Sequence, residues 1–263
     1  MKLEINFVSA FTNVAFKGNP AAVVITQEWL SDELMQLIAT ENNLSETAFA
    51  IKQGDASYKI RWFSPAAEID FWGHATLATA FVLFNRDKHL NDVVFFADAV
   101  GSLVVTPAAD GFIRMSFPNR KPIRVDAVPS NLADALSIKP HEVYSSQQAY
   151  FVVYENEEDV LTVIQNKEPL RKLAPLDVVV TAKSVKYDFI SRYFWPTNDG
   201  DEDPVTGSIH AGLAPLWAEK LGKTTLTAFQ ASQRGGYLEC QVKGDRVFVS
   251  GQAVPYLSGF IYL

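Results

Sequence analysis

Three ionisable side chains, Glu46, His74 and Asp203, are the candidates for acid/base chemistry. Glu46 stands between Leu44 and the apolar run 48–51. Such an environment favours the protonated form of a carboxyl group, as a residue that takes up and returns a proton requires. His74 and Asp203 each precede a segment with helical apolar spacing. Each also has a structural interpretation, because glutamates are mostly exposed and a histidine can serve as a core hydrogen-bonding residue.

Two glycine-containing turns could bind an anion. The turns 73–76 and 207–208 both open an apolar helical segment. Backbone N–H groups at the start of a helix have no partner within it and carry a partial positive charge, so they can hold a carboxylate or a developing oxyanion. The sequence predicts one helix from Gly73 and a second after Gly207 that stops at Gly222.

Three blocks of the chain recur in the same order at nearly constant spacing, which predicts an internal duplication. The spacings are 131 residues for Arg61 and Arg192 and for Phe63 and Phe194, 134 for Gly73 and Gly207, and 135 for Gly101 and Gly236. These values are close to half of the 263 residues. We therefore predict two similar halves, residues 1–118 and 119–263, with a C-terminal strand that can return to the first half.

The elements expected in each half follow one order: strands, a helix, strands, a glycine-opened helix, strands. Ser31 is an N-cap candidate for the first surface helix. A second surface helix is expected over 157–165, with Val160, Leu161 and Ile164 on one face, and Pro215 should kink the last helix. The fold class predicted is α+β, with a mostly antiparallel, barrel-like sheet around a central helix, built twice.

Composition excludes several classes of partner. The net charge is −7 and no basic run is present, which argues against nucleic acid. No apolar stretch approaches 18 residues, which argues against a membrane span. The single cysteine, Cys240, excludes an internal disulfide and is expected to be a buried small side chain. A cytoplasmic protein is the simplest expectation.

The acidic loop 198–203 does not have the pattern of a metal site. A calcium loop needs a glycine where Pro204 stands, and no pair of histidines has metal-ligand spacing. Asp199 and Asp201 are expected to be solvated, whereas Asp203 is better placed to face a ligand. No metal and no cofactor are predicted.

Four motifs together resemble those of a known family. GNPAAVV, NLSETAF, GHATLATA and DEDPVTGSIHAGLAPLWAEKLGK occur in this order and are similar to the hallmark pattern of the PhzF-like isomerases, which share the fold of diaminopimelate epimerase. The resemblance implies two similar domains with the site in the cleft between them, and a homodimer. It places an acid/base glutamate on Glu46, a cleft histidine on His74, and a second-domain pair on Asp203 and Ser208.

The substrate-binding candidates lie in the same motifs: Asn19, Ser45, Gly73, Ala75, Thr76, Thr206, Gly207 and Ser208. Epimerases of this fold work with one thiol in each loop. Here Trp72 precedes Gly73, Asp203 and Pro204 lead the second loop, and neither loop contains a cysteine. Racemisation by two thiols is therefore excluded.

The leading hypothesis is a cofactor-independent isomerase that moves a proton on a small carboxylate-bearing metabolite, with Glu46 as acid and base. His74 and Asp203 would orient polar groups of the substrate or act as second proton carriers. One alternative is an epimerase or racemase that uses carboxylates in place of thiols. Another is a metabolite-binding protein without catalysis.

Overall fold

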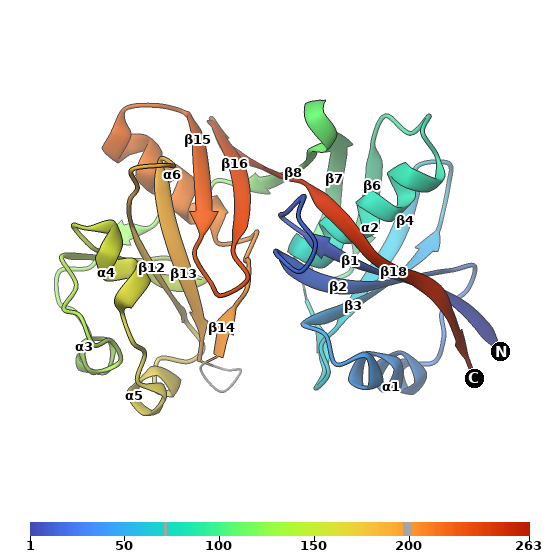
Figure 1. Cartoon of the computed structure of the whole chain (residues 1–263), viewed down its shortest axis with the longest axis horizontal. Helices are drawn as coiled ribbons and strands as arrows, with labels where there is room; N and C mark the ends of the chain where they lie inside the picture. Colours follow the sequence, from blue (N-terminus) through green and yellow to red (C-terminus); the bar gives the residue numbers. More distant parts are fainter. Residues whose placement is uncertain (71–72, 197–200) are drawn as a thin grey trace. The chain divides into compact units, whose positions relative to one another are not determined.

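The computed structural model describes residues 1–70, 73–196 and 201–263 (Figure 1). The chain forms two compact units. The first contains Met1–Ser116 together with Ser250–Leu263, and the second contains Phe117–Val249. Both termini of the chain therefore belong to the first unit. No helix in the described part of the chain is long and apolar enough to cross a membrane.

The first unit is built on strands that surround one helix. Its strands are β1 (Lys2–Ala10), β2 (Asn19–Thr26), β3 (Glu46–Lys52), β4 (Ser57–Phe63), β5 (Glu68–Ile69), β6 (Val93–Ala97), β7 (Gly101–Pro107), β8 (Ile113–Pro118), which runs on into the second unit, and β18 (Ala253–Tyr262). A short 3₁₀ turn, η1 (Ala109–Gly111), precedes β8. Helix α2 (Gly73–Arg86) is buried along most of its length and contacts β1, β2, β3, β7 and β18. A helix that is apolar on all sides belongs inside such a sheet.

Helix α1 (Asp32–Asn42) covers the outer face of this sheet. It begins as the sequence predicts, because the Ser31 hydroxyl accepts a hydrogen bond from the Leu34 backbone N–H at 3.2 Å. Its apolar side packs on β1–β4 in a second core, formed by Leu3, Ile5, Ala22, Val24, Met35, Ile38, Ala39, Phe49 and Phe63. The first unit thus has an inner helix and an outer helix on the two faces of one sheet.

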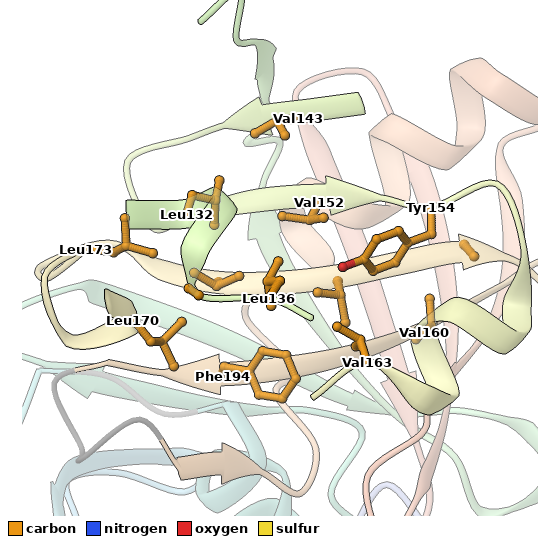
Figure 2. Packing of buried hydrophobic residues seen from close by; sticks show 14 of the residues in the cluster. Leu132, Leu136, Val143, Val152, Tyr154, Val160, Val163, Leu170, Leu173 and Phe194 are labelled. Carbon is orange, nitrogen blue, oxygen red and sulfur yellow. The ribbon is translucent and has the colours of Figure 1, made fainter. Parts of the chain in front are cut away.

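The second unit repeats this plan. Its strands are β9 (Ile123–Arg124), β10 (Glu142–Ser145), β11 (Ala149–Val153), β12 (Asp177–Lys183), β13 (Phe189–Trp195), β14 (Asp201–Asp203), β15 (Thr225–Gln230), β16 (Gly236–Lys243) and β17 (Arg246–Gly251), which ends in the first unit. Helix α6 (His210–Leu221) is the buried helix. The outer face is covered by α3 (Ser130–Asp134), α4 (Glu157–Thr162) and α5 (Lys167–Arg171). Figure 2 shows side chains of these segments, among them Leu132, Val160 and Leu170, in one cluster with Phe194 of the sheet.

Strand pairing confirms the duplication. In the first unit β2 pairs parallel with β3, β3 antiparallel with β4, β4 antiparallel with β5 and parallel with β6, and β6 antiparallel with β7. The second unit has the same five pairings among β11, β12, β13, β14, β15 and β16. The predicted fold class, two similar α+β halves with barrel-like sheets, is correct.

Matched arginines show the repeat at the level of side chains. Arg61 on β4 forms two hydrogen bonds of 2.6 Å to Glu68 on β5 and lies over the Phe63 ring at 5.2 Å. Arg192 on β13 forms two of 2.8 and 2.9 Å to Glu202 on β14 and lies over Phe194 at 5.2 Å. Each arginine therefore joins the two strands of a short hairpin.

The surface helix predicted over 157–165 is shorter than expected. Helix α4 ends at Thr162, and Leu161 and Ile164 are exposed, so the predicted apolar face is wrong. The buried residues are Val160 and Val163. After Thr162 the backbone pairs with another segment. The Ile164 carbonyl accepts a hydrogen bond from the Ser137 backbone N–H, and Gln165 forms an isolated β-bridge with Leu136. This pairing takes the place of a last helical turn.

Helix α6 continues through Pro215 because another part of the chain takes over the lost hydrogen bond. A proline has no N–H to donate to the carbonyl four residues earlier. That carbonyl, of Ala211, accepts the backbone N–H of Arg120 at 3.0 Å. The helix then ends as predicted at Gly222, which adopts a left-handed conformation with φ of 67°.

Candidate functional site

Glu46 and His74 are brought together in the first unit by two strand starts and a helix start. Glu46 is the first residue of β3 and Asn19 the first residue of the adjacent, parallel β2. His74 is the second residue of α2. Glu46 Oε2 contacts His74 Nε2, and Asn19 Nδ2 lies 3.3 Å from His74 Nδ1. The motifs that carry these residues are far apart in the sequence, and the sheet places them side by side.

Asn19 determines which ring nitrogen of a neutral His74 carries the proton. An amide nitrogen can only donate, so Nδ1 of His74 must accept from Asn19. The ring proton then lies on Nε2, the nitrogen that faces the Glu46 carboxylate. A proton can therefore be held between a carboxylate and an imidazole, the two side chains most used for proton transfer near neutral pH.

The burial of this group is nearly complete. Glu46 is 0% exposed and His74 is 1% exposed. Within the described residues, Glu46 Oε1 accepts no hydrogen bond. A buried carboxylate oxygen without a donor is costly, and native structures keep such groups mainly where a role requires them. The arrangement can exchange a proton with a molecule that reaches Oε1.

The predicted binding residues around Glu46 lie at the adjoining segment ends. Ser45 directly precedes β3 and is half-buried. Gly73, Ala75 and Thr76 form the buried first turn of α2. Trp72, the residue that stands before Gly73 where thiol epimerases would have a cysteine loop, is outside the described residues. The helix start predicted at Gly73 is confirmed, and the binding roles stay predictions.

In the second unit, Asp203 belongs to a tightly hydrogen-bonded turn before α6. It ends β14 and is 6% exposed. The Thr206 hydroxyl donates to Asp203 Oδ2. Gln230, at the end of β15, donates from Nε2 to the Asp203 carbonyl at 2.9 Å and accepts the Thr206 backbone N–H at 2.9 Å. Gln230 thereby fixes the turn that presents Gly207, and no sequence pattern indicated it.

Ser208 is connected to a second carboxylate, which sequence reasoning missed. Gln148 Nε2 donates to Ser208 Oγ at 3.0 Å and to the Tyr193 hydroxyl at 3.2 Å, and that hydroxyl donates to Asp177 Oδ2. Burial raises the pKa of Asp177 to about 7, the bond from Tyr193 opposes this, and nearby Asp203 adds to it. The repeat could have found Asp177, because it lies 131 residues after Glu46.

His210, the first residue of α6, has a structural environment. It is fully buried, its Nδ1 lies 2.9 Å from the Thr206 carbonyl oxygen, and its ring is 5.9 Å from that of Phe189. Burial lowers its pKa to about 4, so it is neutral at physiological pH. Of the acidic loop, Asp201 is exposed and bonded to Lys167 at 2.5 Å, while Asp199 is outside the described residues.

Comparison with known proteins identifies the family to which this chain belongs. Residues 8–259 match the family described as phenazine biosynthesis-like protein, PhzC-PhzF. The chain belongs to this family. An uncharacterized isomerase of Pseudomonas aeruginosa is 45% identical, with both chains covered completely. A PhzF-family crystal structure from Enterococcus faecalis is 43% identical, with a TM-score of 0.94 and complete coverage of both chains.

The fold extends beyond the PhzF-like isomerases. A hydroxyproline epimerase of Agrobacterium vitis, crystallised with trans-4-hydroxy-L-proline, is 13% identical with a TM-score of 0.63, over 99% of this chain and 91% of that one. At this identity the likeness shows the shared fold alone. The PhzF membership supports an isomerase class. The roles of Glu46, His74 and Asp203, and a site shared by the two halves, stay predictions.

Proposed function

We propose that this protein is a cofactor-independent isomerase that moves a proton on a small carboxylate-bearing metabolite, with Glu46 as acid and base. The observation that carries the proposal is the buried carboxylate of Glu46, in contact with His74 on Oε2 and without a described donor on Oε1. Oε1 is the oxygen that takes the proton from carbon and returns it. Family membership supports an isomerisation but does not specify the atoms involved.

His74 would hold the Glu46 carboxylate in place and carry charge during the transfer. Its Nε2 proton would be donated to the Glu46 carboxylate and would hold that carboxylate in one orientation toward the substrate. When Glu46 has accepted that proton, the neutral imidazole remains its neighbour, and Asn19 keeps the ring orientation unchanged. The first turn of α2, with Gly73, Ala75 and Thr76, would bind negative charge through its backbone N–H groups.

For the second unit, considered by itself, we propose a binding role. Asp203 would accept hydrogen bonds from polar groups of the substrate or serve as a second proton carrier. Ser208 would donate its hydroxyl to a substrate carboxylate, with Thr206 and Gly207 in the same turn. The rigid contacts from Gln230 support this, because a binding turn that is already fixed loses little conformational entropy when a ligand arrives.

The test is solvent deuterium exchange. Small carboxylic and amino acids are incubated with the protein in D₂O and analysed by mass spectrometry. Positioned acid/base catalysis contributes roughly 10²–10⁴-fold, so Glu46→Gln should reduce exchange by about that factor with an unchanged melting temperature. Glu41→Gln, at an exposed position of α1, is the matched control and should exchange at the wild-type rate.

The outcomes separate the alternatives. A new ultraviolet absorbance together with exchange indicates migration of a double bond. Deuterium at an α-carbon with the skeleton unchanged indicates an epimerase that uses carboxylates. Stabilisation by a compound that never exchanges would indicate a binding protein and refute the proposal. Full exchange by the Glu46→Gln protein would remove Glu46 from the role.

A further inference from the structure

The second unit contains a chain of hydrogen bonds from Asp177 through Tyr193 and Gln148 to Ser208, and the direction of each bond is set by chemistry. Burial raises the pKa of Tyr193 well above its ordinary value, so this hydroxyl keeps its proton, which it donates to Asp177. The Tyr193 oxygen is then an acceptor and receives one N–H of Gln148, whose other N–H goes to Ser208.

The duplication places this carboxylate at the same point of the fold as Glu46. Ala21 of β2 is the register partner of Glu46 on β3, and Ala149 of β11 is that of Asp177 on β12. In both units the carboxylate opens the strand. In the first unit the carboxylate contacts His74, the residue after Gly73, directly. In the second unit the residue after Gly207 is a short serine, and Tyr193 and Gln148 bridge the remaining distance.

We propose that Asp177 is a positioning residue that sets, through Tyr193 and Gln148, the direction in which Ser208 presents its hydroxyl proton. When Asp177 is ionised, Ser208 accepts from Gln148, and its own proton points away from that amide and is available to an anion. This assignment of Ser208 to substrate rests on the proposed function. The hydrogen-bond chain itself does not.

Protonation of Asp177 would reverse the chain. A protonated carboxyl can donate to the Tyr193 oxygen, whose proton then turns toward Gln148. Gln148 must present its carbonyl oxygen instead, and that oxygen accepts the Ser208 proton. The groups that face Asp177 within the described residues are Tyr193 of β13 and Asp203 of β14. With the pKa of Asp177 raised to about 7 by burial, the reversal falls near neutral pH.

The experiment follows the chain by NMR on the complete protein without ligand. A pH titration from 5 to 9 records the Asp177 carboxyl carbon, the Gln148 side-chain amide and the Ser208 Cβ. We expect all three signals to shift with one midpoint near pH 7. In the Tyr193→Phe protein, Asp177 should still titrate while the Gln148 and Ser208 signals lose that step.

Tyr144→Phe is the matched control. It removes the hydroxyl of another tyrosine of the same unit, which donates a hydrogen bond of 3.3 Å to Glu142. The Gln148 and Ser208 signals of this variant should keep the midpoint that they share with Asp177 in the wild type. Gln148 and Ser208 signals that do not titrate in the wild type, or that titrate equally in Tyr193→Phe, would overturn the proposal. Because no substrate is present, these outcomes are independent of the Glu46→Gln exchange test.

Discussion

A methyl group added at Gly212 should destabilise the second unit by about 2 kcal/mol. The Cβ of an alanine there would lie 2.5 Å from Cζ of Phe151 and 3.2 Å from the Arg120 carbonyl oxygen. Phe151 is 1% exposed, so its ring has little room to move. Overpacking of a core costs roughly 1–3 kcal/mol. Because the new methyl group would approach Phe151 to 2.5 Å, we expect a cost at the upper end of this range. Alanine offsets about 1 kcal/mol of this through its helix propensity.

A double-mutant cycle with Phe151→Leu tests this origin of the effect. Leucine lacks the ring atoms that the new methyl group meets, so in that background the helix propensity and the contact with the Arg120 carbonyl oxygen remain. Gly212→Ala should then change the stability by less than about 1 kcal/mol relative to Phe151→Leu alone. The free energies come from urea denaturation followed by circular dichroism. An equal loss of stability in both backgrounds would show that the contact with Phe151 is not responsible.

Two further predictions concern pH and assembly. The lowered pKa of His210, about 4, means that the unfolded chain binds more protons between pH 4 and 6.5, so this residue makes stability fall as the pH drops through that window. The raised pKa of Asp177, about 7, has the opposite effect on the free energy of unfolding. The folded chain binds more protons at this residue, so stability increases as the pH falls from 7 toward 4. Urea midpoints from pH 4.5 to 8 should therefore show less acid sensitivity in His210→Gln and more in Asp177→Asn, and parallel curves would contradict both. We also expect a homodimer, because β18 exposes the aromatic side chains of Phe260 and Tyr262 on one face. Light scattering should report two copies, with a shift toward one in Phe260→Lys, and a monomeric wild type at micromolar concentration would contradict this.

Local chemistry made several boundaries predictable from the sequence. The Ser31 hydroxyl and the left-handed conformation of Gly222 are decided by neighbouring residues alone, so the start of α1 and the end of α6 are where they were expected. The duplication was also visible, because Arg61 and Arg192 occupy the same position in two copies of one hairpin. These features depend only on residue types and sequence spacings, so they can be predicted without knowledge of tertiary contacts.

Other features depend on partners that no local pattern reveals. Helix α4 is short because Gln165 pairs with Leu136, which lies in a different part of the chain. Gln230 and Gln148 hold the second-unit turn, but a single glutamine at a strand end has no periodicity to indicate this. Such residues become apparent only when the fold brings their partners within hydrogen-bond distance.

The candidate site was predictable in composition but not in its contacts. Separate motifs predict Glu46 and His74 as site residues, and their direct contact follows from the position of α2 beside β3. The helix starts were recognised from glycine and apolar spacing. The role of Asn19 in fixing the His74 ring required the structure, since 55 residues separate the two in sequence.

Duplication followed by divergence is consistent with the different roles that we propose for the two units. Each has a carboxylate at the start of the equivalent strand and a buried helix that begins at Gly73 in the first unit and shortly after Gly207 in the second. In the first unit the residue after the glycine is His74, whose ring nitrogens contact the Glu46 carboxylate and the Asn19 amide. In the second it is Ser208, whose hydroxyl can orient a proton but not give it up near neutral pH. We therefore propose that equivalent positions of the two units transfer a proton in the first unit and direct a hydrogen bond in the second.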